Sequence, residues 1–580
     1  MPTTIEVNKQ SVEALLGSGK SKPFVIPEYQ RPYAWTDEQV ETLFEDLWDF
    51  TATSGGTERE SSYFLGSVVS YENEDGEQEI IDGQQRITSL FLLLRAIYTK
   101  LIATPASERT AEANNFIGKI EPTIWRTNKL TGMVDFKNIL LTSRVVNNEG
   151  NEILRSILET GKADEDAKDN YSKNYRHFQE LFDKHSTENP LMVYQFIYAL
   201  LNQAILLPIT ADTQDTALTI FSTLNDRGLP LSDADIFKAK IYNQLAPDDK
   251  KVFIDRWKDL DEQSTDANES IQQLFYYNMF YYRARDKDTK TTTPGVRKYY
   301  AVNKFERLYK PELLDTLFVI LNLWKVVNKG EELEDEAWSK NIKIRQTLDI
   351  LTSYPNEYWK YPVVIYYVCY RNEENFETRF ARFLNKLLME LMTKYLMIPT
   401  INAVKPDILK LNSAIVASDI PTFEFKTVDM TQLEPYIQNP NRNAVRMLLK
   451  TLAYEHQDDL LPAKWEIEHI FPQKWQTNYF PDEPDATIKE KIEHIGNKLP
   501  FEKKLNIVAG NGYFGKKKKE YTASEIVITK AMGTSDVMDW NLESITKRDI
   551  RVSDEVVKIM NRWNNEYLNI SISEGKMGEP

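Results

Sequence analysis

The groups best suited to chemistry lie in the C-terminal part of the chain, in the sequence W-E-I-E-H-I-F-P-Q. A glutamate and a histidine are adjacent there, Glu468 and His469. Asn497 follows, Asn506 stands nine positions after it, and a run of four lysines begins at Lys516. A histidine whose pKa is near neutrality can take a proton from water, and Mg²⁺ and Mn²⁺ accept carboxylate and amide oxygens as ligands. This order of groups predicts hydrolysis of a phosphodiester with the help of one divalent cation.

The same residues also have an ordinary structural interpretation, with Glu-His on a surface strand and the asparagines in turns. The dipeptide recurs at Glu493 and His494, where Asn497 follows too closely for a hairpin to intervene. We therefore expect His494 to be structural. Asn511 could replace Asn506 as a ligand, but Asn511 precedes a glycine, and that pair is typical of a turn.

The C-terminal pattern resembles the HNH, or ββα-metal, nucleases. The resemblance implies that His469 is the general base and that Asn497 orients its loop. Glu468 and Asn506 would hold Mg²⁺ or Mn²⁺, and Lys517 would contact the phosphate. The sequence lacks the paired cysteines that many of these nucleases use for a structural zinc.

A second group of polar residues lies in the N-terminal part, in the sequence I-I-D-G-Q-Q-R, where a predicted strand ends and an apolar helix begins. A helix N-terminus attracts anions through its free N–H groups and its dipole, and Arg86 could form paired hydrogen bonds with a phosphate. A local interpretation is as simple: Asp82 could be the helix N-cap and Gln85 its capping-box partner. The residues taken alone favour the local interpretation.

The wider sequence resembles the GmrSD family of modification-dependent (type IV) restriction endonucleases. The motif D-G-Q-Q-R is preceded by I-P-E-Y-Q-R-P-Y-A-W and followed by F-S-T-L-N-D-R-G-L-P-L-S, which resembles the GmrS half. The HNH-like pattern resembles the GmrD half, so the similarity covers roughly residues 10–245 and 435–570.

The GmrS resemblance implies a ParB/sulfiredoxin-like domain that binds or hydrolyses a nucleoside triphosphate (GTP, ATP or UTP) without a P-loop. Arg31 lies in the upstream loop, where arginine and aromatic side chains could stack on a base. Arg227 lies in the downstream motif and would reach a phosphate, although a surface arginine that braces a turn is an equal alternative. The residues expected at the nucleotide are Arg31, Asp82, Gly83, Gln84, Gln85, Arg86 and Arg227.

Composition narrows the class of protein. A net charge of −16 argues against a surface coated with nucleic acid, because phosphate binding needs Lys and Arg, yet Lys503, Lys504 and Lys516–Lys519 could form a local basic groove. The single cysteine, Cys369, excludes an internal disulfide framework and fits a reducing cytoplasm. The sequence has neither a signal peptide nor an apolar run of membrane-spanning length, so we expect a cytoplasmic protein without a membrane partner.

At 580 residues the chain is too long for a single core, and its patterns predict a multidomain α+β protein. Residues 1–245 would form the nucleotide-binding sensor domain, in which a hairpin leads into a helix. Residues 246–434 would form a helical coupling domain, and residues 435–580 the HNH nuclease domain with its closing helix. Within the first domain, residues from about 110 to 200 are expected to be mostly helical.

Two helix starts are predicted from capping residues. Thr36 and Gln39 form a capping-box pattern before an apolar helix face. Ser232 or Asp233 would cap the helix that follows the downstream motif.

Together these features predict an endonuclease of anti-phage defence that cleaves modified phage DNA under nucleotide control. A homodimer is plausible, because double-strand cleavage benefits from two active sites. One alternative is a nicking or relaxed DNase that acts in abortive infection. Another is a catalytically inactive, nucleotide-gated DNA-binding protein.

Overall fold

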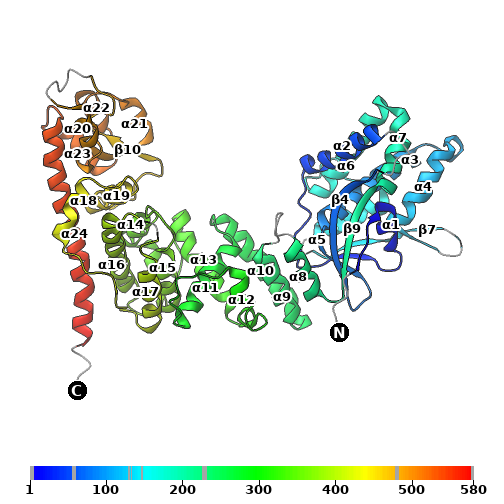
Figure 1. The fold of residues 1–580 in the computed structure, drawn as a ribbon, viewed down its shortest axis with the longest axis horizontal. Helices are drawn as coiled ribbons and strands as arrows, with labels where there is room; N and C mark the ends of the chain where they lie inside the picture. The colour runs from blue at the N-terminus through cyan, green and yellow to red at the C-terminus, as the bar shows by residue number, and fades with distance from the viewer. Residues whose placement is uncertain are drawn as a thin grey trace. The chain divides into compact units, whose positions relative to one another are not determined.

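The computed structural model describes residues 6–54, 61–128, 131, 133–145, 148–224, 232–400, 402–476 and 483–575. The chain folds into two compact units, Met1–Lys258 and Asp259–Pro580 (Figure 1). Each unit is described separately below.

The first unit is built on a mixed seven-stranded sheet whose order is β1-β9-β4-β5-β3-β8, with β2 also paired to β9. β4 and β5 form the predicted antiparallel hairpin, while β9 runs parallel to β4 and β3 runs parallel to both β5 and β8. The strands are β1 (Glu6–Val7), β2 (Gln10–Ser11), β3 (Phe24–Ile26), β4 (Tyr63–Glu72), β5 (Gln78–Asp82), β8 (Leu141–Ser143) and β9 (Ala204–Ala211).

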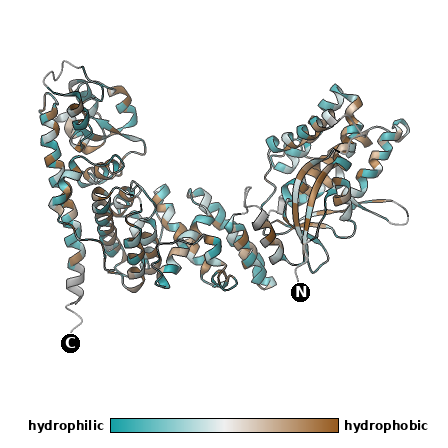
Figure 2. Ribbon diagram, in the orientation of Figure 1, coloured by the Kyte–Doolittle hydropathy of each residue, from teal (hydrophilic) through white to brown (hydrophobic). Residues whose placement is uncertain are grey.

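The helix that leads out of the hairpin, α3 (Gln84–Ala103), forms the centre of the first core. Its residues Ile87, Leu90 and Leu94 are fully buried, and it packs against α4, α5 and α6. Figure 2 shows the apolar residues running along the central strands of the sheet, where they meet this core. The other helices are α1 (Val12–Ser18), α2 (Asp37–Ser54), α4 (Ala111–Ile124), α5 (Asn148–Thr160), α6 (Asn170–Glu188), α7 (Val193–Tyr198), α8 (Gln214–Leu224) and α9 (Asp233–Gln244), followed by α10 (Pro247–Asp266), which crosses the boundary between the units.

The two predicted helix starts agree with the structure. At α2, the Gln39 side chain accepts a hydrogen bond from the backbone N–H of Thr36 at 2.8 Å, which is one half of a capping box. At α9, Ser232 is the cap, and its hydroxyl accepts from the N–H of Asp235. Residues 110–200 are mostly helical, as expected, and this stretch also contains the short strands β6 (Trp125–Thr127), β7 (Val134–Ile139) and β8.

The second unit begins with a helical array and ends with a small α+β module. The array comprises α11 (Ile271–Arg285), α12 (Val296–Tyr300), α13 (Leu313–Lys329), α14 (Ile342–Leu351), α15 (Lys360–Tyr370), α16 (Phe376–Met397), α17 (Lys405–Ala417), α18 (Glu434–Gln438) and α19 (Val445–His456). The module comprises β10 (Trp465–His469), α20 (Asp485–Lys491), β11 (Lys498–Glu502), α21 (Lys503–Ala509), α22 (Phe514–Thr522), α23 (Val527–Thr534) and α24 (Leu542–Gly575).

β10 and β11 pair antiparallel, with Trp465 opposite Glu502 and His469 opposite Lys498. α21 begins directly after β11. This strand–strand–helix order agrees with what the ββα-metal prediction requires. The more specific assignments, ββα-metal here and ParB-like in the first unit, stay predictions.

The helix α24 links the array and the module within the second unit. It packs against α16, α18 and the 3₁₀ turn Ile495–Asn497. Lys386 of α16 donates to Asn564 at 2.7 Å. The helices predicted as a coupling domain and the predicted nuclease module therefore lie in one compact unit, and the three domain boundaries stay a prediction.

The mixed α+β, multidomain class predicted from the sequence is confirmed. Across the described ranges, every helix is too short or too polar to cross a lipid bilayer.

Candidate functional site

Glu468 and His469 are the last two residues of strand β10, and their side chains lie in different environments. Successive side chains of a strand point to opposite faces of the sheet. Glu468 is only 4% exposed and faces α22, where the Tyr521 hydroxyl donates to its Oε1 at 2.7 Å and the Lys517 ammonium lies 2.8 Å from the same oxygen. Within the described residues, Glu468 Oε2 has no hydrogen-bond partner, so one carboxylate oxygen remains available to a ligand.

Lys517 differs from the sequence expectation, because its position in the fold is buried. It shares one face of α22 with Phe514 and Tyr521, and that face packs on the β10–β11 strand pair. Burial lowers the pKa of Lys517, while the charge of Glu468 opposes that shift. Its ammonium also donates to the carbonyl of His469. In this structure Lys517 neutralises Glu468 and holds the strand end, and its side chain is not exposed to a phosphate.

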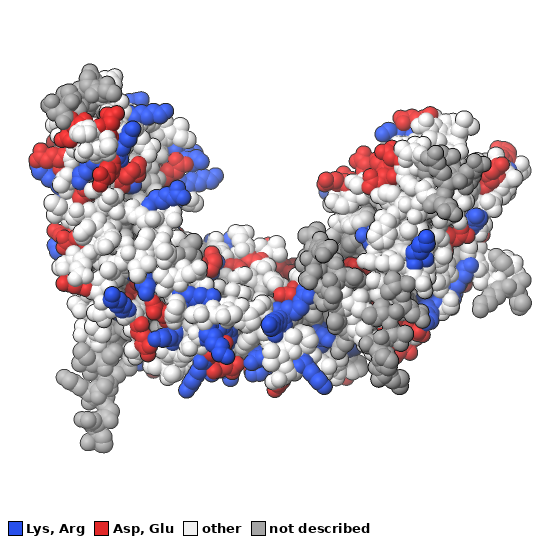
Figure 3. Space-filling view, in the orientation of Figure 1, with Lys and Arg blue, Asp and Glu red and all other residues white. Residues whose placement is uncertain are grey.

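The solvent-facing cations of this module are other lysines. Lys503, Lys504, Lys516 and Lys519 are exposed. On the face drawn in Figure 3, both units carry Lys and Arg mixed with Asp and Glu. A basic contact to a nucleic acid would therefore be local.

His469 lies in a partly buried position beside a carboxylate. Its Nε2 is 3.4 Å from Glu493 Oε1 and 3.4 Å from the amide nitrogen of Gln473. Burial lowers the pKa of His469 below its usual value, and the neighbouring Glu493 charge opposes this shift without reversing it. The imidazole is therefore neutral near pH 7, which is the form a general base requires.

Glu493 is a residue that sequence reasoning missed. Its carboxylate also pairs with Lys498 at 2.8 Å, which fixes it beside the imidazole. The signal in the sequence that could have identified it is the second Glu-His dipeptide, Glu493-His494. His494 bonds Asp549 of α24 at 2.8 Å, which agrees with the structural role expected for it.

Asn497 fixes the loop that follows His469. It is fully buried, its Oδ1 accepts from the N–H of Phe471 at 2.7 Å, and its Nδ2 donates to the carbonyls of Phe471 and Ile492. The Trp540 indole N–H donates to the same Oδ1 at 3.2 Å. These contacts are consistent with the bracing role that the HNH resemblance implies, and that role stays a prediction.

Asn506 and Asn511, the two candidates for the metal-ligating asparagine, have different contacts. Asn511 donates to the carbonyl of Lys474 at 2.7 Å and accepts from its N–H at 3.2 Å, so its amide is engaged by the backbone. Asn506, on α21, lies with its Nδ2 3.4 Å from Glu466 Oε2, not against Glu468. Glu466 and Glu468 share one face of β10, so Asn506 approaches the face that carries both carboxylates.

In the first unit, Asp82 ends β5 and is not the helix N-cap. Gly83 is the N-cap of α3, with φ 88°, and a Cβ there would lie 3.1 Å from the carbonyl of Ser67. The local interpretation of Asp82 as N-cap is therefore wrong. Burial raises the pKa of Asp82, and this shift is opposed by the Gly83 N–H and by the charges of Arg86 and Arg31.

Arg86 lies beside β4 and lines a pocket. Its guanidinium donates to the carbonyl of Ser67 at 3.1 Å, and burial lowers its pKa. Gly66, with φ +113°, leaves the space that the guanidinium occupies, because a Cβ there would lie 3.0 Å from it. The pocket has a volume of about 370 Å³ and is also lined by Trp35 and Tyr63.

The two glutamines of the motif hold the upstream loop. Gln85 accepts from the N–H of Ala34 at 2.7 Å and donates to the carbonyl of Pro32 at 3.1 Å. Gln84 donates weakly to the carbonyl of Arg31 at 3.4 Å. Its Oε1 is buried without a hydrogen-bond partner in the described structure. An orphaned buried acceptor of this kind indicates a place where a ligand or water completes the site.

Of the other two residues predicted to contact the nucleotide, the structure describes only Arg31. Arg31 is exposed, and its charge acts on Asp82. Arg227 lies outside the described residues. The structure thus brings Arg31, Asp82, Gly83, Gln84, Gln85 and Arg86 together at the start of α3.

Comparison with protein families gives two matches. Residues 12–242 match the model described as "GmrSD restriction endonuclease, N-terminal domain". Residues 429–552 match the model described as "GmrSD restriction endonucleases, C-terminal domain". A search of curated proteins finds no match.

Proposed function

Because the chain belongs to the GmrSD restriction endonuclease family, we propose that it is a cytoplasmic, Mg²⁺- or Mn²⁺-dependent endonuclease that cleaves modified phage DNA under the control of a nucleoside triphosphate. One observation carries the catalytic part of this proposal. An imidazole that is neutral near pH 7 stands next to a buried carboxylate at the end of β10, and the loop after it is held by a fully buried asparagine.

The donor atoms around β10 fit a hard divalent cation. Glu468 Oε2 and the Asn506 side-chain oxygen lack hydrogen-bond partners among the described residues, and both are oxygen donors. Such a cation, held by Glu468 and Asn506, would supply neutralisation of charge on the scissile phosphate. Mg²⁺ is commonly held by one or two carboxylates together with substrate phosphates and water, so a sparse protein ligand set is adequate.

The protein's own groups divide the remaining work. A carboxylate can only accept hydrogen bonds, so Glu493 favours a proton on His469 Nε2 and leaves the lone pair on Nδ1. Nδ1 of His469 then takes the proton of the attacking water. Asn497 keeps the loop after His469 in register, and Lys517 offsets the charge of Glu468 in the core.

The first unit would bind the nucleotide at the start of α3. Arg86 and Arg31 supply positive charge there, Gly83 permits a close approach to the helix N-terminus, and Gln84 presents an unsatisfied acceptor. We propose that this domain also senses the DNA modification. A homodimer would supply the second active site that double-strand cleavage needs.

A catalytically inactive, nucleotide-gated DNA-binding protein is the rival function. One observation favours it: Glu468 is only 4% exposed, and its charge already pairs with Lys517 at 2.8 Å. The rival predicts DNA binding without metal-dependent cleavage.

The test is a panel of phage DNAs, modified and plain, incubated with the full chain and Mg²⁺, with and without GTP, ATP or UTP. We expect cleavage of modified DNA that EDTA abolishes and that one nucleotide changes. Equal cleavage of plain and modified DNA would replace the proposal with a relaxed DNase. Intact DNA under all conditions would support the inactive rival.

A further inference from the structure

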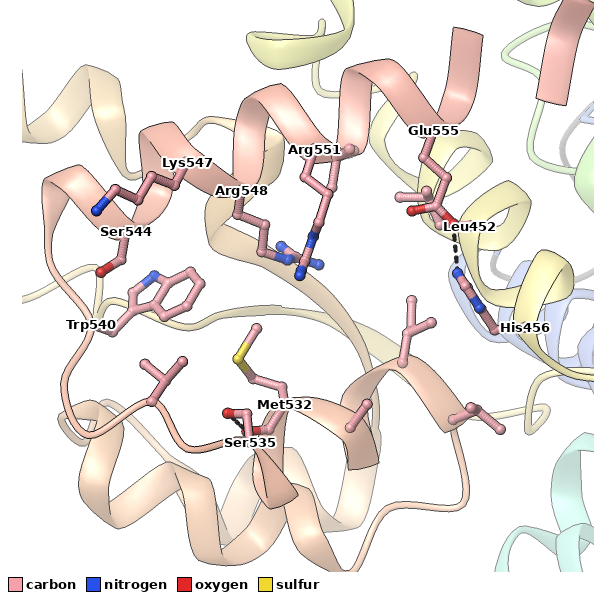
Figure 4. Close-up of a pocket in the computed structure, with 15 residues that line it drawn as sticks. Leu452, His456, Met532, Ser535, Trp540, Ser544, Lys547, Arg548, Arg551 and Glu555 are labelled. Atoms are coloured by element: carbon pink, nitrogen blue, oxygen red, sulfur yellow. Dashed lines mark hydrogen bonds and ion pairs between the residues drawn. The ribbon is translucent and has the colours of Figure 1, made fainter. Parts of the chain in front are cut away.

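A second cavity lies in the second unit, and one of its lining residues, Trp540, donates to Asn497. It has a volume of about 660 Å³ and lies between α19, α23 and α24. In Figure 4, Arg548 and Arg551 point from α24 toward Met532 and Ser535 of the α23 region, and Trp540 closes one end. Its size is that of a site for a small organic ligand.

One side of this cavity is apolar. Leu452, Val527, Met532, Val537 and Trp540 line it. Val527 is 43% exposed and Val537 is 36% exposed, so apolar surface is left in contact with water. Covering that surface with an apolar group of a ligand would be favourable.

The opposite side carries the guanidinium groups of Arg548 and Arg551. Within the described residues, Arg551 forms no ion pair or hydrogen bond, although it lines the cavity. Burial, and then the repulsion between its charge and that of Arg551, lowers the pKa of Arg548 to about 10, while the charges of Asp549 and Glu555 oppose this shift. Glu555, the nearby carboxylate of α24, is paired with His456 at 2.5 Å.

We propose that this cavity binds an organic anion with an apolar body, such as an aromatic or aliphatic carboxylate, sulfonate or phosphate ester. The anionic group pairs with Arg551, which relieves its repulsion with Arg548. The apolar body covers Met532, Val537 and the face of Trp540. Neutral apolar compounds lack the anionic group that pairs with Arg551, and inorganic phosphate lacks the apolar body.

Two of the lining residues also hold the loop of the candidate nuclease site. The Trp540 indole donates to Asn497, and Arg548 donates to the carbonyls of Ile495, Gly496 and Lys498 at 3.1, 2.9 and 2.8 Å. A ligand in the cavity would contact the side chains of Trp540 and Arg548. Occupancy is therefore expected to change the rate of DNA cleavage, and this second effect rests on the proposed function.

The experiment uses 8-anilinonaphthalene-1-sulfonate, an aromatic sulfonate whose fluorescence rises in apolar sites. The probe is titrated into the full chain, and the saturable signal is compared among variants. Arg551→Glu removes the anion partner and is expected to weaken binding about tenfold or more, as the loss of one charged hydrogen bond would. Ala531→Trp, at the exposed rim of the cavity, is expected to remove the same component by filling the space.

The matched control is Lys558→Glu, which makes the same charge change on an exposed residue of α24 that does not line the cavity. It should leave the titration unchanged. Identical titrations for the parent chain, Arg551→Glu and Ala531→Trp would overturn the site. If the variants lose the probe while no DNA is cleaved under any condition, the cavity stands and the proposed nuclease function fails.

Discussion

The two polar motifs of this chain, one in each compact unit, are built alike but use their side chains differently. In each, a strand ends and a side-chain amide holds a nearby loop: Gln85 holds the loop before α2, and Asn497 holds the loop after β10. Gln85 does so at a partly exposed site, whereas Asn497 is fully buried.

Within each motif, some side chains hold the protein structure and others remain available to a ligand. Near α3, most of the D-G-Q-Q-R side chains contact protein, and the groups left for a ligand are the Gln84 acceptor and the arginines. Near β10, the asparagine that holds the loop, Asn497, lies distant in sequence from Glu468 and His469. The Glu468–His469 pair is thereby left with an open carboxylate oxygen and a neutral imidazole.

The largest effect on stability is expected for Asn497→Ala. It would leave the N–H and carbonyl of Phe471 and the Trp540 indole without partners in a buried site. We expect a loss of about 3 kcal/mol in the free energy of unfolding, measured by denaturant titration. Asn443→Ala, at an exposed position of the same unit, is the control. A change below that of the control would contradict the bracing role.

Arg86→Ala should affect nucleotide binding rather than folding. If the Arg86 guanidinium contacts a phosphate, its removal should weaken binding about tenfold, as measured by calorimetry with GTP, ATP and UTP. Arg126→Ala removes an exposed arginine of the same unit and should have no effect. Unchanged affinity in Arg86→Ala would remove the nucleotide role from the start of α3.

Gln85→Ala tests the weaker of the two braces. Because its hydrogen bonds lie at a partly exposed site, we expect a loss of about 1 kcal/mol in the free energy of unfolding. The comparison with Asn497→Ala would be broken if Gln85→Ala proved as destabilising as the buried substitution.

Glu493→Gln should shift the pH dependence of cleavage. The charge of Glu493 raises the pKa of His469 against the larger effect of burial. Without that charge, the His469 pKa falls further, so the imidazole stays neutral to a lower pH. The acidic limb of the rate profile should therefore move to lower pH. An unchanged limb would show that Glu493 does not act on the titrating group.

Sequence patterns predicted local features well where the cause was local. The capping pattern at Thr36 and the hairpin that leads into α3 are examples, because turn and capping chemistry act over a few residues. The loop-bracing role assigned to Asn497 by resemblance stays a prediction, and its hydrogen bond to the N–H of Phe471 is consistent with that role.

The differences arise from contacts between distant segments. Gly83 takes the N-cap position because the backbone of β4 lies against it, which no local pattern at Asp82 indicates. Lys517 is buried because the Phe514 and Tyr521 side chains place its face of α22 on the β10–β11 strand pair. The short strand β8 was missed because its partner is the distant strand β3.

We propose that the neutral imidazole of His469 activates the water that breaks a DNA strand. The most direct test compares Mg²⁺-dependent cleavage by the parent chain and by His469→Ala, with DNA binding and thermal unfolding measured on both. We expect cleavage to fall by about a thousandfold, while binding and unfolding stay unchanged. Cleavage at the parent rate in a folded His469→Ala protein would contradict it.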